Sequence, residues 1–313
     1  MCRRNAFFAV LGIFCFALSS ISFASGFSDY FNSAAPSVGM SFLKIGMGAR
    51  AVALGGAYSP IVKDATAVYW NPGAVIYSDG MDVNFSHLSL MEGINYEFAA
   101  ISTGDGNQGI GIGLGGLFYG GMELRDERAS VDPIGTFDAY SFLVKLSYGH
   151  KLGNDFIGGV SIDGILEKIY VYSASTYTID FGLRYSPSIL KSVSISLNIN
   201  NLGPKVVFVD ETTRLPLATK LGFAFSKKMG KTNVILASEV SKSIDSPISG
   251  AVGIEGSYSF ISLRVGYNYS KMNSIRWAGG LGVKYRFASI DYSFSPYLLD
   301  LGTKQVASVS FDF

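Results

Sequence analysis

Few side chains in this sequence could carry out acid–base, nucleophilic or metal chemistry. The 313 residues contain two histidines, His87 and His150, and two cysteines, Cys2 and Cys15. Two isolated histidines do not make a metal site, because a zinc ion takes three or four protein ligands. To act as the base of a hydrolase, His87 would need a nearby serine, and Ser86 points to the opposite face of an extended strand. The sequence therefore predicts no enzymatic activity, no metal and no cofactor.

Two short motifs match nucleotide-binding patterns without the structural context that these patterns need. The run from Gly111 to Gly116 has the glycine spacing of a dinucleotide fingerprint, which requires a helix N-terminus directed at the pyrophosphate. Here apolar residues alternate with the glycines, as in a strand. Residues 230–232 lack the upstream glycine of a P-loop and fall in an expected hairpin turn. The net charge of +1 also argues against a nucleic-acid partner, which would require a basic surface.

The composition is low in charge and rich in glycine and aromatic residues. Charged residues make up 16% of the chain, against about 25% in ordinary globular proteins. There are 37 glycines, 23 phenylalanines and 18 tyrosines but only 2 tryptophans. This composition excludes a disordered chain and a coiled coil.

The first 24 residues have the features of a signal peptide. Arg3 and Arg4 form a basic start, residues 6–18 are apolar, and Ser22-Phe23-Ala24 is a small-x-small cleavage signature. The apolar run is shorter than the roughly 20 residues that a membrane-spanning helix needs. We therefore expect cleavage after Ala24, which also removes both cysteines.

From about residue 80 onward the chain alternates between apolar and polar residues. In residues 192–200, Val193, Ile195, Leu197 and Ile199 alternate with serine and asparagine, as in a strand with one apolar face. Fourteen segments show this pattern: 81–90, 94–102, 109–119, 137–149, 155–168, 174–186, 191–201, 215–226, 231–241, 247–257, 260–269, 275–287, 288–297 and 304–313.

The connections between these segments favour a membrane barrel over a soluble sandwich. Connections after even-numbered segments, such as 151–154 and 227–230, are short, whereas 120–136 and 202–214 are long, and outer-membrane barrels sort their turns in this way. Tyr140 with Tyr148, and Tyr177 with Tyr185, bracket apolar residues at about the spacing of two aromatic girdles. We therefore predict an all-β membrane protein, a 14-stranded antiparallel transmembrane β-barrel over residues 80–313, in the bacterial outer membrane.

The last strand ends in two aromatic residues on its apolar face, Phe311 and Phe313. A barrel pairs its last strand with its first, so that no strand edge faces lipid. A terminal aromatic on such a strand resembles the signal read by the bacterial barrel-assembly machinery, which we expect to be a partner together with outer-membrane lipids.

Residues 25–79 do not alternate and are rich in glycine and alanine. Asp64 is expected to cap one or two helical turns that Pro72 ends. A barrel of 14 strands is wider than one whose side chains fill the interior. We therefore predict that residues 25–79 form a hatch, or plug, inside the barrel.

The same segment carries a family resemblance. The runs 42–46, 49–51, 54–58 and 69–73, with Asp64-Ala65 between them, resemble the N-terminal signature of the PorV/PorQ family of outer-membrane barrels, which are similar to the long-chain fatty-acid transporter FadL. The resemblance implies a 14-stranded barrel with an internal hatch. FadL-like members pass hydrophobic compounds such as long-chain fatty acids, whereas PorV is an adaptor in type IX protein secretion. Hydrophobic small molecules or secreted proteins are thus both open as partners.

Candidate residues follow from these expectations. Arg50 is a gate or ligand anchor, or else it forms an ion pair with Asp64, Asp180 or Glu255, because an unpaired buried charge is costly. The hatch and gating candidates are Arg50, Gly55, Gly56, Asp64, Trp70, Asn71, Pro72 and Gly73. Glycine weakens a strand and permits a kink, and FadL-like proteins have a lateral opening at the corresponding strand. Gly113, Gly115 and Gly116 are therefore the candidates for a lateral opening to the membrane.

Overall fold

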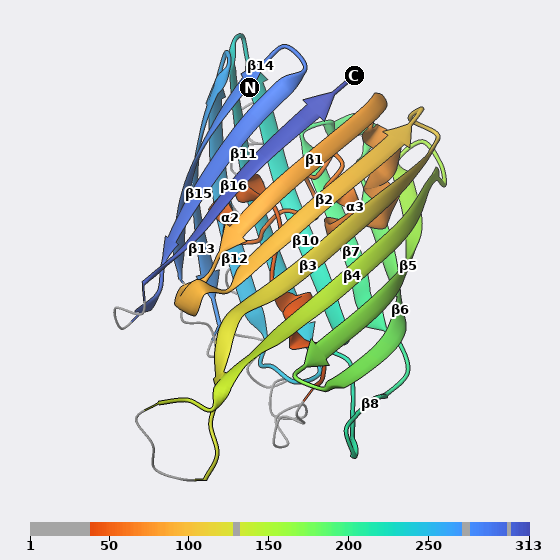
Figure 1. Cartoon of the computed structure of the whole chain (residues 1–313). Helices are drawn as coiled ribbons and strands as arrows, with labels where there is room; N and C mark the ends of the chain where they lie inside the picture. The colour runs from red at the N-terminus through yellow and green to blue at the C-terminus, as the bar shows by residue number, and fades with distance from the viewer. Residues whose placement is uncertain (1–37, 128–131, 271–275, 299–301) are drawn as a thin grey trace.

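The chain forms a closed, antiparallel barrel of 14 strands (Figure 1). The structure is a computed structural model that describes residues 38–127, 132–270, 276–298 and 302–313, so the predicted signal peptide lies outside the described residues. The barrel strands are β1 (Gly80–Ser89), β2 (Asn95–Gly104), β3 (Gln108–Leu124), β4 (Gly135–Lys151), β5 (Phe156–Ile169), β6 (Tyr172–Tyr185), β7 (Val193–Leu202), β10 (Ala218–Met229), β11 (Thr232–Ser243), β12 (Ser249–Tyr258), β13 (Ile261–Tyr269), β14 (Trp277–Tyr285), β15 (Ala288–Pro296) and β16 (Thr303–Asp312). The predicted fold class is confirmed, because each predicted segment corresponds to one of these strands.

The first and last strands close the barrel. β16 pairs with β1 from Asp82 opposite Asp312 to Ser89 opposite Gln305. Every barrel strand therefore has two hydrogen-bonded neighbours, which leaves no strand edge to face lipid.

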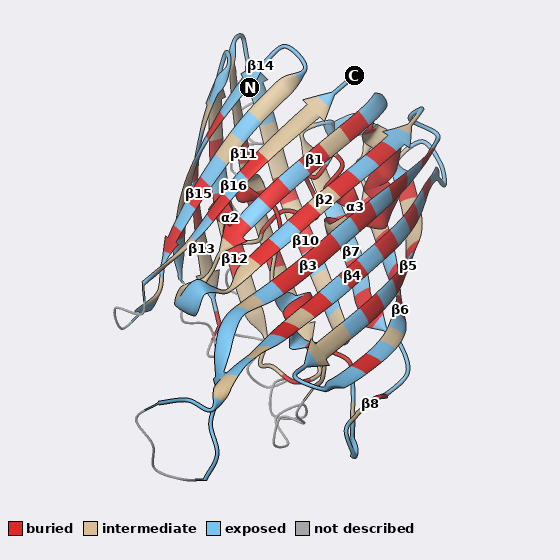
Figure 2. Cartoon of the chain, in the orientation of Figure 1, coloured by how far each residue is buried: buried red, intermediate tan, exposed pale blue. Residues whose placement is uncertain are grey.

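Exposed and buried residues alternate along the barrel strands (Figure 2), and the two faces differ in polarity. Along β3, Ile110 and Leu114 face outward and are 55% and 52% exposed, while the alternate residues are buried. Buried wall residues include ionic ones, such as Lys145 and Asp163. An apolar exterior around a polar interior is the reverse of a soluble protein and matches a barrel that spans a bilayer. Among the described residues, no helix is both long and apolar enough to cross a membrane.

The two rims of the barrel differ in their connections. At the rim near the C-terminus the strands are joined by turns such as 230–231, 259–260 and 286–287. The opposite rim carries most of the long connections, and the longest one described in full, 203–217, contains the hairpin of β8 (Val206–Phe208) and β9 (Glu211–Thr213). The expected separation of short turns and long loops between the two rims has an exception, because the two residues 170–171 alone join β5 and β6 at this rim. We call the short-turn rim the inner rim and the other the outer rim, because short turns face the periplasm in such barrels.

Residues 38–79, which we call the inner segment, pack against the inward-facing side of the barrel wall (Figure 1). Their elements are η1 (Ser41–Lys44), α2 (Ala49–Ala53), α3 (Ala67–Trp70) and η2 (Pro72–Tyr77). α2 contacts β13 to β16, and η2 contacts β2 to β6. The inner segment thus spans the lumen between two parts of the wall.

The local structure around Pro72 differs from the expectation. α3 begins at Ala67 with Thr66 as its N-cap, and Asp64 accepts a hydrogen bond from the backbone N–H of Thr66 (2.9 Å) rather than capping the helix directly. Pro72 ends α3 but also starts η2, because a proline at the first helical position loses no hydrogen bond. Periodicity could not reveal η2, which is only six residues long.

Candidate functional site: the inner segment and the cavities beside it

Glycines on the inner face of the wall let the backbone of η2 approach closely. A Cβ atom built on Gly159 would lie 2.4 Å from the backbone nitrogen of Gly73, and one built on Gly109 would lie 2.7 Å from the carbonyl oxygen of Val75. Real side chains do not make contacts this short, so only glycine fits here. We call these wall residues the larger glycine patch: Gly104, Gly109, Gly149, Gly159 and Gly182.

A second group of glycines receives the turn after α2. A Cβ on Gly266 would lie 2.1 Å from the backbone nitrogen of Gly55, and Cβ atoms on Gly253 and Gly280 would meet Leu54 and Ala53. We call Gly253, Gly266 and Gly280 the smaller glycine patch. Within the turn itself, Gly55 and Gly56 have φ angles of +68° and +91°, a backbone region that glycine adopts without strain.

Arg50 forms an ion pair with Glu255, one of the three partners that the sequence suggested. Its Nε and a terminal nitrogen donate to the two carboxylate oxygens at 2.8 Å each. Arg264 donates to the same carboxylate (2.6 Å) and to Asp291 (2.6 Å). Burial opposes the charge of Arg50, but the nearby Tyr58, Glu255 and Asp64 outweigh it and raise the pKa of Arg50. A bidentate pair of this kind, in which Glu255 is buried and Arg50 is partly exposed, holds α2 to β12 with defined geometry.

The remaining acids that were suggested as partners of Arg50 have other contacts. Asp64 accepts hydrogen bonds from Thr66 and from the hydroxyl of Tyr58 (2.8 Å). Asp180 accepts from Lys145 (2.8 Å), which also pairs with Asp163. This second cluster belongs to the wall strands β4, β5 and β6.

A third set of contacts fixes the segment between α2 and α3. Arg184 of β6 donates to the carbonyl oxygens of Ser59 (2.8 Å) and Val62 (2.7 Å). Glu239 of β11 accepts from the backbone N–H of Ser59 (3.2 Å). Buried backbone groups of this loop are therefore satisfied by wall side chains, as buried polar groups must be.

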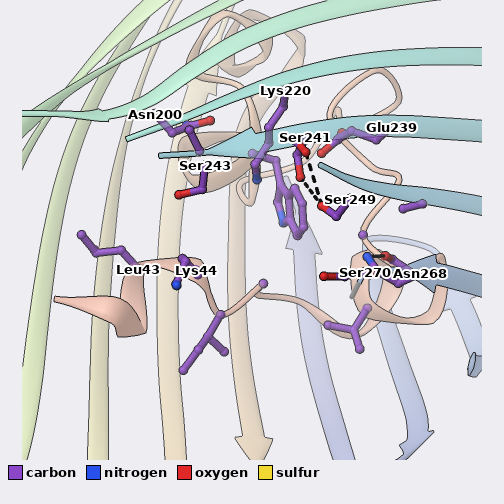
Figure 3. A pocket seen from close by; sticks show the side chains of 18 of the residues that line it. Leu43, Lys44, Asn200, Lys220, Glu239, Ser241, Ser243, Ser249, Asn268 and Ser270 are labelled. Atoms are coloured by element: carbon purple, nitrogen blue, oxygen red, sulfur yellow. Dashed lines mark hydrogen bonds between the residues drawn. The ribbon is translucent and has the colours of Figure 1, made fainter. Parts of the chain in front are cut away.

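A cavity of about 650 Å³ lies between the inner segment and the wall, on the side of the outer rim. Its apolar lining is Leu43, Ile45, Val52, Tyr69, Trp70, Leu90 and Leu143, and its charged lining is Lys44, Lys145, Asp180, Lys220, Glu239 and Lys304. Figure 3 shows Leu43 and Lys44 across the cavity from Lys220 and Ser241. The cavity, which we call the outer cavity, is therefore lined by apolar groups together with charged groups of both signs and with serine and asparagine side chains.

An ion pair lies beside the outer cavity, where η1 meets the connection between β11 and β12. Lys44 donates to Asp245 at 2.6 Å. Burial disfavours the charged form of Asp245, but hydrogen bonds from Lys44 and Ser243 outweigh it, so the pKa of Asp245 is lowered.

A second cavity of about 430 Å³ lies toward the inner rim. Arg50, Asp64, Asp82, Glu255 and Asp291 contribute to its largely polar lining. Gly55 and Gly56 line the outer cavity, whereas Arg50 and Tyr58 line the inner one. Residues 50–58 thus lie between the two cavities.

The predicted site residues fall into three groups. Gly55, Gly56 and Trp70 line the outer cavity, and Arg50 and Asp64 line the inner one. Trp70 is held in place by a hydrogen bond from its indole N–H to the carbonyl oxygen of Met47 (2.9 Å).

Asn71, Pro72 and Gly73 line neither cavity and are buried against the wall. The side chain of Asn71 accepts a hydrogen bond from the backbone N–H of Gly73 (3.1 Å), which caps η2. A Cβ on Gly182 would lie 2.8 Å from the Cδ atom of Pro72. These residues therefore form a rigid turn that docks on the larger glycine patch.

The glycines proposed for a lateral opening lie in an unbroken ladder. Gly113, Gly115 and Gly116 pair with β2 on one side and β4 on the other. A Cβ on Gly113 would approach Val68 of α3 and the ring of Phe98 within 3.0–3.2 Å. The irregularity in β3 occurs later, between Tyr119 and Met122. In this structure Gly113 makes room for the inner segment, and the lateral opening remains a prediction.

Phe311 and Phe313 lie at the inner rim, where Phe313 stacks on Phe287 (5.8 Å between ring centroids) and is 63% exposed. Their proposed recognition by the assembly machinery also remains a prediction.

Two features of the site were not found from the sequence. The two glycine patches consist of glycines at inward positions of several strands. In the sequence they can be recognised only after the inward and outward faces of each strand have been assigned. The Lys44–Asp245 pair joins residues about 200 positions apart, which local patterns cannot reveal. Over the described ranges, no group of three or more His, Cys, Asp or Glu residues is placed to hold a metal ion.

The fold and the partly occupied lumen define an outer-membrane-type β-barrel whose interior holds residues 38–79. No family model matches the chain, and a search of curated proteins finds no match. Among solved structures, the chain is similar to the CymD monoaromatic hydrocarbon channel (TM-score 0.57, 11% identity, covering 88% of this chain and 99% of that chain). It is also similar to the toluene transporter TodX of Pseudomonas putida (TM-score 0.56, 11% identity, covering 79% of this chain and 93% of that chain). A third similar structure is a FadL homologue of Pseudomonas aeruginosa (TM-score 0.51, 12% identity, covering 86% of this chain and 99% of that chain). At these identities the likeness establishes the fold.

Proposed function

We propose that this protein is an outer-membrane channel for hydrophobic compounds, in which residues 38–79 act as a hatch. The outer cavity carries this proposal, because it offers an apolar surface inside the barrel next to the segment that separates the two rims. Binding sites for small molecules are typically concave, mostly apolar and 300–1,000 Å³ in volume, roughly the size found here. The structural neighbours whose names mention toluene and monoaromatic hydrocarbons support the same class of cargo.

The charged lining narrows the class of cargo to amphiphiles such as long-chain fatty acids. Lys220 lies over the ring of Trp70 (4.9 Å to the centroid) and faces the cavity. Lys304 lies at the outer end of β16 and, within the part of the chain that the structure describes, makes no hydrogen bond or ion pair. A carboxylate would supply the missing partner of Lys304, while the alkyl chain covers Leu43, Ile45 and Leu143.

Passage requires the hatch to move, because residues 50–58 lie between the cavities. The ion pair between Arg50 and Glu255 holds these residues in place, and Arg184 holds the adjoining stretch through the carbonyl oxygens of Ser59 and Val62. We propose that a rearrangement of the turn around Gly55 and Gly56 joins the cavities, since glycine tolerates large changes in φ. The protein is then a gated, passive channel.

The test is uptake in a deletion strain that is complemented with variants. We expect Lys220→Gln/Lys304→Gln to reduce uptake of a long-chain fatty acid by about tenfold, because charge-assisted hydrogen bonds to a carboxylate contribute about 1.5–3 kcal/mol. Uptake of toluene should be unchanged. Lys205→Gln, at an exposed position outside the cavity, is the control. Equal uptake of the fatty acid by all strains would refute the proposal.

A secretion adaptor of the PorV type is a second candidate, favoured by the connection between β7 and β10. Its two short strands pair as a hairpin that exposes Val207 (57%) and Val209 (48%) at the outer rim, a surface suited to a protein partner. The same deletion strain distinguishes the candidates. Loss of secreted surface proteins with normal fatty-acid uptake would favour the adaptor.

A further inference from the structure

The outward face of β1 and β2 carries an ion pair. His87 and Glu97 are opposite each other in the ladder of these two strands. Nδ1 of His87 lies 2.6 Å from a carboxylate oxygen of Glu97, and the two side chains are 53% and 52% exposed. Phe85 and Ile101, outward residues closer to the inner rim, are exposed and apolar. Other ion pairs of the wall, such as that of Lys145, face the lumen, whereas this pair is on the side that faces lipid.

The ion pair lies inside the boundary that aromatic residues mark toward the outer rim. Phe118 and Phe294 face outward and are exposed. Their partners in the ladders are Asn95 and Gln305, and Asn95 lies two residues closer to the outer rim than Glu97. Girdles of aromatic residues mark the boundary between acyl chains and headgroups in such barrels. Because an ionised side chain among acyl chains is costly, the pair predicts a partner other than lipid.

Each member of the pair keeps a polar atom for such a partner. Within the described ranges, the side chains of His87 and Glu97 make one hydrogen bond, to each other. Nε2 of His87 and the second carboxylate oxygen of Glu97 therefore have no partner in this chain. An imidazolium donates from both ring nitrogens, and a carboxylate accepts at both oxygens. A surface that presents the same pair would satisfy both atoms.

Small residues flank the ion pair on the neighbouring strands, which lie side by side with β1 and β2 (Figure 1). Ala307 of β16 is opposite His87, and Gly116 of β3 is opposite Glu97. Between transmembrane helices, small residues let two backbones approach closely while polar side chains bind across the contact, and the same packing argument holds for the face of a strand pair. The row therefore has the composition of a protein contact.

The positions around the ion pair are self-complementary. Two copies in one membrane have the same orientation, so a two-fold axis between them runs along the membrane normal, and the same patch of each copy forms the contact. An axis in front of β1 and β2 places β1 of each copy against β2 of the other. Residues that are opposite each other in the β1–β2 ladder then also meet across the contact. His87 would meet Glu97 of the second copy, twice.

The rows on either side of the ion pair fit the same axis. Phe85 is opposite Ala99, and Ser89 is opposite Asn95. Across the contact, the exposed ring of Phe85 would cover the small side chain of Ala99, and Ser89 would exchange a hydrogen bond with Asn95. The three rows thus bring a large side chain against a small one, opposite charges together, and donors to acceptors. We call these residues the β1–β2 patch: Phe85, His87, Ser89, Asn95, Glu97 and Ala99.

We propose that the β1–β2 patch is the interface of a two-fold homodimer in the outer membrane. Each Glu97 accepts from Nδ1 of His87 in its own copy and from Nε2 of His87 in the second copy. The contact lies outside the barrel, so it goes beyond the proposed channel function and does not depend on it.

The test is co-purification of two differently tagged copies of the full chain, co-expressed and extracted from outer membranes in a mild detergent. His87→Glu leaves two carboxylates in each patch, and Glu97→Lys leaves two cations. Either variant alone should recover at least about tenfold less of the second copy than wild type, because like charges replace two charge-assisted contacts. Co-expression of the two variants recreates both opposite-charge contacts and should restore the recovery.

A second variant tests the contact without a change of charge. The indole of Ala99→Trp occupies the space of Phe85 from the second copy and should also lower the recovery by at least about tenfold. Leu263→Trp, at an outward position of β13 that is 60% exposed, is the control and should behave as wild type. Migration before and after boiling verifies that each variant is folded.

Three outcomes would overturn the inference. Wild type could fail to co-purify with itself, or Ala99→Trp and the single charge variants could be recovered as well as wild type. Failure of the mixed charge variants, each of them folded, would show that a different outer-membrane protein meets the patch. Fatty-acid uptake is measured separately, so the channel and the dimer can fail independently.

Discussion

At the scale of single residues, ion pairs to buried carboxylates hold the inner segment to the wall. Glu255 is central, because it accepts hydrogen bonds from Arg50 of the inner segment and from Arg264 of the wall. The side chains of Glu255 and Arg264 are only 4% and 5% exposed. Removing one charge from such a cluster leaves the others buried without compensation, which costs more than the pair itself contributes.

We therefore expect Glu255→Gln to lower the free energy of unfolding by about 3 kcal/mol, measured by urea titration in detergent micelles. Lys284→Gln is the matched control, because its pair with Asp312 is exposed on both sides and exposed pairs contribute at most about 1 kcal/mol. If both variants lost the same stability, Glu255 would not be an anchor of the inner segment.

The Lys44–Asp245 pair predicts a response to acid. The pKa of Asp245 is lowered in the folded protein, so the pair stabilises the contact above the ordinary pKa of aspartate. This stabilisation is lost as the pH falls through the lowered pKa. In a Trp277→Phe background, acrylamide quenching of Trp70 should therefore increase in acid. Asp245→Asn should show the increased quenching already at neutral pH, and an unchanged acid response in this variant would contradict the prediction.

At the scale of elements, close backbone contact positions the short helices of the inner segment. Helices of four to six residues are not stable alone, and η2 instead rests on the larger glycine patch across five strands. Each of these glycines is needed because a larger side chain would collide with residues 71–76, and not because the strand that contains it needs glycine.

Gly159→Val should displace η2 and make the barrel permeable, because its Cβ would lie 2.4 Å from Gly73. We expect liposomes containing this variant to swell several-fold faster in small sugars than liposomes containing wild type. Gly164→Val, on the same strand with no atom within 4 Å of its Cβ, should behave as wild type. Slow swelling in both would show that the inner segment tolerates the added side chain.

At the scale of the whole molecule, the closed ladder and the apolar exterior determine where the protein is stable. Exposed apolar residues cover the outward face, as Ile112, Val144 and Leu281 illustrate, and a closed barrel has no free edge at which unfolding could begin.

The folded barrel should therefore migrate differently from the boiled chain on a denaturing gel and should need detergent to remain dispersed. As a control, an unboiled sample that has first been denatured in urea should migrate like the boiled chain. Identical migration before and after boiling, or solubility of the folded chain without detergent, would contradict a membrane-spanning barrel.

The sequence by itself determined the strand count, the outward faces and the class of protein, because alternation of side chains is a local property that a two-residue period reports directly. It also indicated that Arg50 needs a partner, yet it left Glu255, Asp180 and Asp64 equally possible. Only the tertiary structure decided among them and placed the glycines of five strands against η2. These contacts join residues far apart in the chain, and they depend on how the barrel closes around the inner segment, which no local pattern records.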